Sequence, residues 1–327
     1  MKHLDSKIDL VYVGERNGKF ASILEGNSDI GKTRKIFAGK FRRYHGESWL
    51  RRLIDVKTIA LNFRDAGYFI IGTIQSFFLV RIEKPDVIFL KGGFVGVPIG
   101  LAGALWRVPM VTHDSDTVPG LANRLVSRWA KIHATAMPAS FYKYPIQNTR
   151  QVGVLVAKEY VEVTPKLISD YRNKLDIPKD AKVLMVTGGS SGAERINKKI
   201  AEIAPELLEK YKNLYIIHQT GNSKEGVYSN FTHQRLRVFG LIKDMYTCSG
   251  AADLIITRAG ANTLAEFGVQ GRACIVIPSP FLTGGHQLKN AQYLDDSKAA
   301  LVIQEDNLDK IYDSIKSLMN DKSLRSK

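Results

Sequence analysis

KVLMVTGGSSG, residues 182–192, decides the fold of this chain of 327 residues, because an apolar strand runs directly into a Gly-Gly-x-x-Gly turn and then into a helix-prone stretch. DVIFLKGGFVG, residues 86–96, repeats the pattern in the first half. Glycine lets a turn approach a ligand closely, and the following helix offers free N–H groups and the positive end of its dipole to an anion. Two copies predict two similar α/β domains that face a central cleft, with a phosphate-bearing ligand between them.

Strands and helices alternate around both turns, which is typical of doubly wound parallel sheets covered by helices on both faces. In the first half we expect a basic loop and helix region after the first strand, strands at 7–14, 87–90, 109–114 and 133–137, and helices at 67–82, 98–106 and 120–131. In the second half we expect strands at 182–187, 214–220, 235–242, 252–260 and 273–280, and helices at 194–211, 244–250, 262–270, 286–296 and 308–321.

The boundary between the two domains is predicted after residue 152. A strand-like run, VGVLV at 152–156, precedes a polar stretch at 163–180 that contains two prolines. We interpret the polar stretch as the passage from an N-terminal domain, 1–152, to a C-terminal domain, 153–327.

Cysteine usage and hydropathy restrict the class of protein. Cys248 and Cys274 form no CxxC pattern and no disulfide framework, which fits a reducing cytoplasm and suggests no metal site. A polar, charged run follows Met1 in place of an apolar signal sequence. The longest apolar stretch, 67–82, is interrupted by two polar residues and is too short to span a bilayer comfortably, so we expect a helix with a wide apolar face.

Positive charge is concentrated in the first half. Residues 1–150 carry 23 lysines and arginines against 12 acidic residues, whereas residues 151–327 carry 24 against 20. Much of the excess lies at 32–52, in Lys32, Arg34, Lys35, Lys40, Arg42, Arg43, Arg51 and Arg52. Such a patch attracts polyanions, either nucleic acid or an anionic membrane face, although a solvated surface would give the same composition.

ITRAGANTLAEFGVQG, residues 256–271, carries the most specific chemistry. A strand ends near Arg258, and a helix begins near Asn262 with its first amides at the carboxyl edge of the sheet, where open α/β sheets bind ligands. Glu266, about one turn along, can accept hydrogen bonds from the two hydroxyls of a ribose while the amides hold a diphosphate. The alternative is that Glu266 only complements the helix dipole.

Three further strand ends bring polar or glycine residues to the same edge. In GGHQLKNAQYL, residues 284–294, the amides of Gln287 and Asn290 lie three residues apart on one helix face and suit the hydroxyls of a sugar. LYIIHQTGN at 214–222 and VFGLIKDM at 238–245 end two more strands. Together these ends predict a nucleotide-sugar pocket.

These segments resemble a known family. TGGSSGAERIN, IIHQTG, VFGLIKDM, RAGANTLAE and HQLKNA occur in its order, as do KGGFVGVPIGLAGALWRVPMVTH and PGLANR in the first half. The chain is similar to the MurG-type N-acetylglucosaminyltransferases of peptidoglycan synthesis, which belong to glycosyltransferase family 28 and have the GT-B fold. The resemblance implies inverting transfer of N-acetylglucosamine from UDP-N-acetylglucosamine to the 4-hydroxyl of the muramyl sugar of undecaprenyl-linked lipid I. It also implies a peripheral location on the cytoplasmic side of the cell membrane and no cofactor.

The resemblance assigns roles to residues of this chain. Donor contacts are implied for Ser190, Ile242, Ala261, Asn262, Thr263, Leu264, Ala265, Glu266 and Gln287. The acceptor diphosphate is implied to bind at Gly92, Gly93 and Gly96. The stretch from His113 to Asp116 reads His-Asp-Ser-Asp where the family usually has His-Glu-Gln-Asn, so His113, Asp114 and Asp116 are the candidates for the base that accepts the acceptor's proton. His113 could equally be a buried structural histidine.

Three family features do not match. A first strand with a turn of the form GGTGGH, expected before KIDLVYVG, is not found in residues 1–6, so a central strand of the first domain is expected to be missing. Ala157 stands where the family has an arginine at the domain junction, with Lys158 adjacent, and the C-terminal end is short. These differences suggest an incomplete reading frame and predict weak or no transferase activity.

Other functions remain open. GGSSG also satisfies the G-x-S-x-G pattern of a serine hydrolase with Ser190 as nucleophile. The basic 32–52 region could bind nucleic acid, but its residues resemble no recognised module, so we expect Arg42, Arg43, Arg51 and Arg52 to contact anionic lipid. Another UDP-sugar transferase with a lipid acceptor would share the fold.

Overall fold

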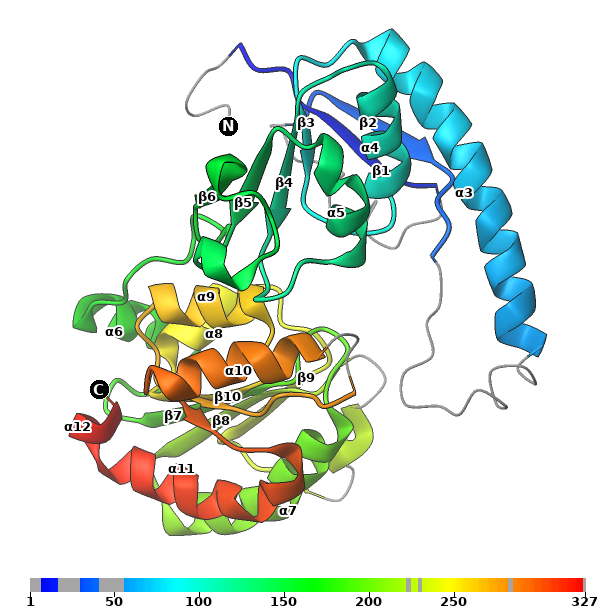
Figure 1. The fold of residues 1–327 in the computed structure, drawn as a ribbon. Helices are drawn as coiled ribbons and strands as arrows, with labels where there is room; N and C mark the ends of the chain where they lie inside the picture. Colours follow the sequence, from blue (N-terminus) through cyan, green and yellow to red (C-terminus); the bar gives the residue numbers. More distant parts are fainter. Residues whose placement is uncertain are drawn as a thin grey trace. The chain divides into compact units, whose positions relative to one another are not determined.

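The computed structural model describes residues 7–16, 30–40, 56–221, 225–228, 231–281 and 285–325. The chain divides into two compact units, Met1–Gly153 and Val154–Lys327, here called unit 1 and unit 2 (Figure 1). This division falls one residue after the boundary that the sequence suggests.

Unit 2 contains a six-stranded, fully parallel sheet. Its strands are β7 (Lys182–Thr187), β8 (Leu214–Gln219), β9 (Leu236–Phe239), β10 (Leu254–Thr257), β11 (Cys274–Val276) and β12 (Leu301–Val302). They lie in the order β12-β11-β10-β7-β8-β9. The chain therefore winds outward from β7 in one direction and then returns to build outward from β10 in the other, so the order reverses between these two strands. Such a topological switch point is where open α/β sheets bind ligands.

Helices cover both faces of the unit 2 sheet (Figure 1). They are α6 (Pro165–Lys174), α7 (Glu194–Lys210), α8 (Met245–Ala251), α9 (Ala261–Val269), α10 (His286–Asp296), α11 (Ile311–Asn320) and α12 (Lys322–Arg325). Successive residues of β7 alternate between the two faces. Leu184 and Val186 pack in the core with α7 and α11, whereas Val183 and Met185 pack with α8 and Phe267 of α9. All four strand residues are fully buried, as expected for a central parallel strand.

The parallel strands of unit 1 form two separate sheets within the described residues, β1-β2 and β3-β4-β5-β6. The strands are β1 (Val11–Glu15), β2 (Lys32–Ile36), β3 (Ile88–Leu90), β4 (Met110–Asp114), β5 (Ile132–Thr135) and β6 (Thr149–Gln151). The helices are α3 (Val56–Glu83), α4 (Gly96–Leu105) and α5 (Leu121–Val126). No strand in the described ranges pairs with both β1 and β3, so the central strand expected to be missing from this domain is not found among them.

The two pieces of unit 1 nevertheless share one core. Ile36 at the end of β2 packs with Ile88 and Leu90 of β3 and with Val80 of α3. Pro98 lies in the first turn of α4, as its fixed φ angle suggests.

Several elements differ from the sequence-based expectation. Residues 152–156 form no strand, since the pairing partner of β5 is the preceding segment, β6. The basic segment 32–36 is a strand and not a loop or helix, because it pairs with β1 while four of its five residues stay exposed. The polar passage between the domains contains α6, whose start is fixed by Thr164, which accepts a hydrogen bond from the Leu167 amide, and by Pro165 in the first turn.

Candidate functional site

The turn after β7 lies beside the switch point. Gly189 and Gly192 both have positive φ angles, 79° and 70°, and Ser190 between them is exposed. Helix α7 begins at Glu194, with Ala193 as its first flanking residue. The turn therefore presents Ser190 to solvent at the carboxyl end of the central strand.

This turn packs directly against the turn that follows β8. A Cβ atom at Gly192 would lie 1.9 Å from the Thr220 carbonyl oxygen, and one at Gly221 would lie 2.7 Å from the Gly192 nitrogen. Neither position can hold a side chain without moving the backbone. The glycines of GGSSG and HQTG thus bring two strand ends into contact, which the sequence pattern alone did not indicate.

A hydrogen-bond chain continues from these turns to Ile242. The Gln219 amide donates to Thr187 Oγ1 at 3.1 Å, and Gln219 Oε1 accepts from the Ile242 N–H at 2.8 Å. The segment after β9 is therefore held by the ends of β7 and β8. Because its N–H is used in this way, Ile242 has its carbonyl oxygen as the backbone group to offer a ligand.

An ion pair and side-chain hydrogen bonds hold the turn after β10. Arg258 donates to the Ile277 carbonyl and pairs with the carboxylate of Glu305, which is 4% exposed and also lies 3.8 Å from Arg195 of α7. The buried Asn290 side chain donates to the Ala259 carbonyl at 3.0 Å. Asn290 therefore holds the turn and does not share an exposed face with Gln287.

Helix α9 starts directly after this turn. Its flanking residue, Gly260, has no side chain to cap the first-turn amides, and the first turn contains no acidic residue. Ala261 is buried and Asn262 is exposed. An uncapped helix start at a sheet's carboxyl edge is suited to bind an anion.

Glu266 lies on α9 and is partly buried. Burial, together with the nearby Glu266 carboxylate, raises the pKa of Tyr160. Sequence reasoning missed Tyr160, because nothing in the run around residues 157–160 marks it as a neighbour of α9. Gln287 is the second residue of α10, and its Oε1 accepts from the Ser279 N–H at 2.9 Å, which leaves its NH2 group as the donor for a ligand.

In unit 1, the predicted acceptor turn follows β3. Gly92 and Gly93 have φ angles of 89° and 81°, and α4 starts at Gly96, whose N–H bonds the Gly93 carbonyl. A Cβ atom at Gly93 would meet nothing within 4 Å. This turn is thus open at Gly93, whereas a Cβ atom at Gly96 would lie 3.6 Å from a Leu90 methyl group.

The three candidate bases lie at the end of β4 in different surroundings. His113 is 1% exposed, and its Nε2–H donates to the Gly153 carbonyl at 3.0 Å. Asp114 is 4% exposed and accepts hydrogen bonds from the Gly120 N–H, the Asn123 amide and the Tyr144 hydroxyl, all at 2.9–3.1 Å. Asp116 is partly exposed.

Tyr144 and His133 complete the surroundings of Asp114. Their rings stack with centroids 4.0 Å apart, and His133 Nδ1 lies 2.9 Å from Thr112 Oγ1. Burial and the Asp114 charge raise the pKa of Tyr144, and burial lowers the pKa of His133. Sequence reasoning missed both residues, since a tyrosine and a histidine in separate loop and strand segments give no local signal.

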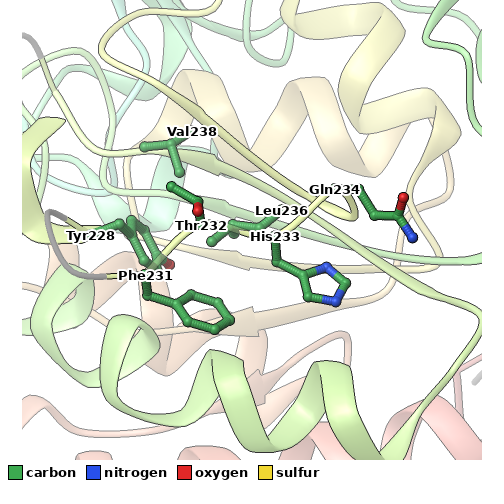
Figure 2. A pocket seen from close by; sticks show the side chains of 7 residues that line it. All are labelled: Tyr228, Phe231, Thr232, His233, Gln234, Leu236 and Val238. Carbon is green, nitrogen blue, oxygen red and sulfur yellow. The ribbon is translucent and has the colours of Figure 1, made fainter.

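Unit 2 also contains a cavity of about 450 Å³ away from the predicted site residues. It lies along β9 and the preceding loop, lined by Tyr228, Phe231, Thr232, His233, Gln234, Leu236 and Val238 (Figure 2). It includes no residue of the predicted donor or acceptor sites.

Solved structures with this fold include MurG of Acinetobacter baumannii, with a TM-score of 0.63, 22% identity, and coverage of 99% of this chain and 87% of that one. The glycosyltransferase of kitacinnamycin gives a TM-score of 0.68 at 13% identity, covering 98% of this chain and 85% of that one. At these identities the likeness shows the fold. The protein has the α/β architecture of the GT-B glycosyltransferases, with two Rossmann-like units.

Family models and curated relatives narrow the class. The glycosyltransferase family 28 N-terminal domain matches residues 23–135, and the glycosyltransferase family 28 C-terminal domain matches residues 183–327. The chain is 31% identical to the UDP-N-acetylglucosamine–N-acetylmuramyl-(pentapeptide) pyrophosphoryl-undecaprenol N-acetylglucosamine transferase of Natranaerobius thermophilus, over 99% of this chain and 86% of that protein. It is 33% identical to an enzyme of that name from Bacillus thuringiensis, over 92% and 80%. The chain belongs to glycosyltransferase family 28 and is an enzyme of the glycosyltransferase class.

Proposed function

We propose that this protein transfers N-acetylglucosamine from UDP-N-acetylglucosamine to the muramyl sugar of undecaprenyl-linked lipid I in peptidoglycan synthesis. Two curated relatives are named for this activity, and each is 31% identical to this protein over almost the whole chain. The observation that carries the proposal is the strand order of unit 2, which puts the turn after β7 and the start of α9 on either side of one switch point.

The donor has a natural position at this edge. The first-turn amides of Ala261, Asn262 and Thr263 in α9 would hold the diphosphate, with Ser190 beside it, whereas the Leu264 N–H already donates to the Gly260 carbonyl at 2.9 Å. Glu266 would accept the ribose hydroxyls, and the Ile242 carbonyl would face the uracil. The NH2 group of Gln287 would donate to the sugar, because its Oε1 already accepts from Ser279. Ala265 would contribute backbone next to Glu266.

The reaction then needs a displacement at C1 of the donor sugar. The acceptor hydroxyl attacks C1 from the side opposite to UDP, its proton passes to a base, and the bond to the diphosphate breaks with inversion. The helix-start amides stabilise the charge that develops on UDP. Gly92, Gly93 and Gly96 would hold the acceptor diphosphate, since their turn is open at Gly93.

Asp116 is the base that we favour. The oxygens of Asp114 accept three hydrogen bonds from the protein, so protonating it would disrupt a buried cluster. His113 is tied to the Gly153 carbonyl and buried. Asp116 is partly exposed and lies two residues beyond the end of the same strand.

The alternative activities have less support. A hydrolase nucleophile on a G-x-S-x-G elbow sits on a strained strand-to-helix turn. Ser190 is not among the residues with positive φ, and α7 begins four residues later. Family 28 membership also argues against a nucleic-acid-binding function and leaves a different UDP-sugar or lipid acceptor as the nearest alternative.

Calorimetry and a transfer assay test the proposal together. We expect UDP and UDP-N-acetylglucosamine to bind, and Glu266→Ala to weaken both by about 100-fold, because two hydrogen bonds to a carboxylate are lost. Glu209→Ala, on the exposed side of α7, is the matched control and should bind normally. With labelled donor and a lipid I analogue, the product should be lipid II. No heat with either nucleotide, or full binding by Glu266→Ala, would exclude this site.

We also propose that unit 1 contacts an anionic membrane through α3. Among the residues that the structure describes, no helix combines the length and apolarity needed to cross a membrane. One face of α3 instead exposes large apolar side chains at spacings of three, four and seven residues, namely Phe63, Ile70, Ile71, Ile74, Phe78 and Ile82. Beside its end, Arg81 lies over the Trp106 ring, a pairing suited to a lipid interface.

The structure bears on only part of the basic 32–52 region. Lys32 and Arg34 pair with Glu83, so their charges are partly compensated within the protein. Arg42, Arg43, Arg51 and Arg52 lie outside the described residues. We therefore expect Ile74→Glu combined with Phe78→Glu to abolish co-sedimentation with phosphatidylglycerol vesicles, whereas Ile146→Glu, at another exposed apolar residue of unit 1, should not. Normal sedimentation of the double variant would contradict the proposal.

A further inference from the structure

Three nearly parallel rings of unit 1, here called the aromatic row, pack against one another in the order His133, Tyr144 and Tyr142. The centroids of His133 and Tyr144 lie 4.0 Å apart, with an interplanar angle of 10°. Those of Tyr144 and Tyr142 lie 5.9 Å apart, with an interplanar angle of 2°. His133 belongs to β5, whereas both tyrosines lie between the 3₁₀ helices Ala139–Phe141 and Ile146–Asn148. The row therefore attaches a segment without regular structure to the sheet.

Each ring of the aromatic row also makes a polar contact with β4 or with the segment that follows it. The partners of His133, Tyr144 and Tyr142 are, in that order, Thr112 Oγ1 at 2.9 Å, Asp114 Oδ2 at 2.9 Å and the Asp116 carbonyl oxygen at 2.8 Å. These contacts fall on every second residue, which is the repeat of a strand. Because β4 itself ends at Asp114, the row continues the strand's spacing two residues beyond the strand.

The hydroxyl of Tyr142 is directed at Asp116. Tyr142 is buried, and its oxygen accepts a hydrogen bond from the Met137 N–H at 3.2 Å. Its single proton is donated to the Asp116 carbonyl. The pairing of β4 with β5 ends at Asp114, so this bond holds the backbone at a point where the sheet no longer does.

We propose that Tyr142 is a positioning residue for the base of the transfer reaction: its hydroxyl holds the Asp116 backbone and thereby sets where the carboxylate meets the acceptor hydroxyl. The inference rests on the proposed function, because it takes Asp116 as the base. Tyr142 lies 26 residues further along the chain, outside the motifs that carry the family resemblance. A base must come within hydrogen-bond distance of the proton that it takes, so a displaced backbone slows the reaction without changing how the donor binds.

Tyr142→Phe tests the inference, because it keeps the ring in the aromatic row and removes only the hydroxyl. With labelled UDP-N-acetylglucosamine and a water-soluble lipid I analogue, we expect kcat to fall about tenfold. Calorimetry should give an unchanged Kd for UDP. The matched control is Ser76→Ala, which removes another buried hydroxyl of unit 1, one that donates to the Gly72 carbonyl at 2.7 Å. This control should change neither kcat nor Kd.

A double variant separates positioning of the base from a structural role. Asp116→Ala removes the carboxylate but keeps the backbone carbonyl that accepts from Tyr142. Adding Tyr142→Phe to Asp116→Ala should therefore not lower the residual kcat further, since the group to be positioned is already gone. An additional loss of the same size as in Tyr142→Phe alone would show a structural role and overturn the inference. An unchanged kcat in Tyr142→Phe alone would overturn it as well.

Hydrogen exchange followed by mass spectrometry gives a readout that needs no turnover. Peptides covering 115–120 should exchange faster in Tyr142→Phe than in the unmodified protein or in Ser76→Ala. Equal exchange in the three proteins would overturn the inference. If the unmodified protein forms no lipid II, or if Asp116→Ala transfers at the full rate, the failure lies in the proposed function or its base. The catalytic role of Tyr142 is then overturned too, whatever the exchange shows about the segment that it holds.

Discussion

The Gly-Gly-x-x-Gly turns of the two units share a sequence pattern but differ in their surroundings. In unit 2, Gly192 packs against the turn after the neighbouring strand, so that a Cβ atom would lie 1.9 Å from a backbone oxygen. In unit 1, a Cβ atom at Gly93 would meet nothing within 4 Å. Strand β7 lies in the middle of a continuous sheet, whereas β3 is the edge strand of a four-stranded sheet that, within the described residues, is not paired with β1-β2.

The difference shows that one motif can serve two purposes. The glycines after β7 are needed by the fold, since they let two strand ends touch. Those after β3 have no such neighbour among the described residues, so their open side is available for a ligand. A glycine-rich pattern in a sequence therefore predicts the turn but not what occupies the space that the missing side chain leaves.

The largest effect should come from a methyl group at the crowded turn. Gly192→Ala combines a positive φ with a collision against the Thr220 carbonyl and should lower the free energy of unfolding of unit 2 by about 5 kcal/mol. Urea unfolding followed by circular dichroism would measure it. A loss below about 1 kcal/mol would mean that the turns after β7 and β8 separate easily, and the proposed difference between the glycine turns of units 1 and 2 would be wrong.

A buried carboxylate in unit 1 should have the next largest effect. Asp114→Ala leaves the Gly120 N–H, the Asn123 amide and the Tyr144 hydroxyl without their acceptor. We expect unfolding to become easier by about 3 kcal/mol, because buried donors that lose a charged acceptor are costly. Asp116→Ala is the control: it should affect transfer much more than stability. A stable Asp114→Ala protein would show that unit 1 accommodates the loss.

Buried histidines make the stability depend on pH. In unit 2, burial lowers the pKa of His218 to about 3, while its ring bonds the Tyr228 hydroxyl and Asn197. The unfolded chain therefore binds a proton below about pH 6.5 that the folded chain does not, so stability falls as the pH drops. Between about pH 7 and pH 5 we expect a loss of about 2 kcal/mol from this residue. His218→Gln should remove that part of the slope in urea titrations; an unchanged slope would assign it to other groups.

The smallest effect on stability is expected at the open turn. The methyl group of Gly93→Ala would lie near no other atom, so only the positive φ angle is unfavourable. We expect it to lower the free energy of unfolding by about 1–2 kcal/mol. The methyl group would, however, stand where we place the acceptor diphosphate. The KM for the lipid acceptor should rise while the affinity for UDP stays unchanged. A stability loss equal to that of Gly192→Ala would remove the distinction between the turns.

The fold of unit 2 could be predicted closely, because its strands are continuous apolar runs and its helices follow glycine turns. The helix expected at 194–211 is α7, Glu194–Lys210, and that expected at 286–296 is α10. Strand β2 could not be predicted, since an exposed strand with three lysines and arginines shows no apolar alternation. Helix α6 was missed although Thr164 and Pro165 carried a start signal.

The candidate site was predicted only as far as local motifs reach. The roles of Glu266 and Gln287 follow from their places after strand ends and stay predictions. Contacts between segments far apart in the chain determine the surroundings of Tyr160 and Tyr144. They also bring Arg195 and Arg258 to Glu305. No spacing rule in the sequence reveals such contacts. The contact of Asn290 was not predicted either: its amide was expected to suit a sugar hydroxyl, but it donates to the Ala259 carbonyl.

The ion pair between Arg258 and Glu305 has a consequence for biosynthesis. Arg258, which leads into α9, is held by a carboxylate that the ribosome adds 47 residues later. While the protein is being made, the turn that we propose to bind the nucleotide must wait for Glu305 to emerge, long after its own strand has been translated. We expect a nascent chain stalled before Glu305 to be unable to retain UDP.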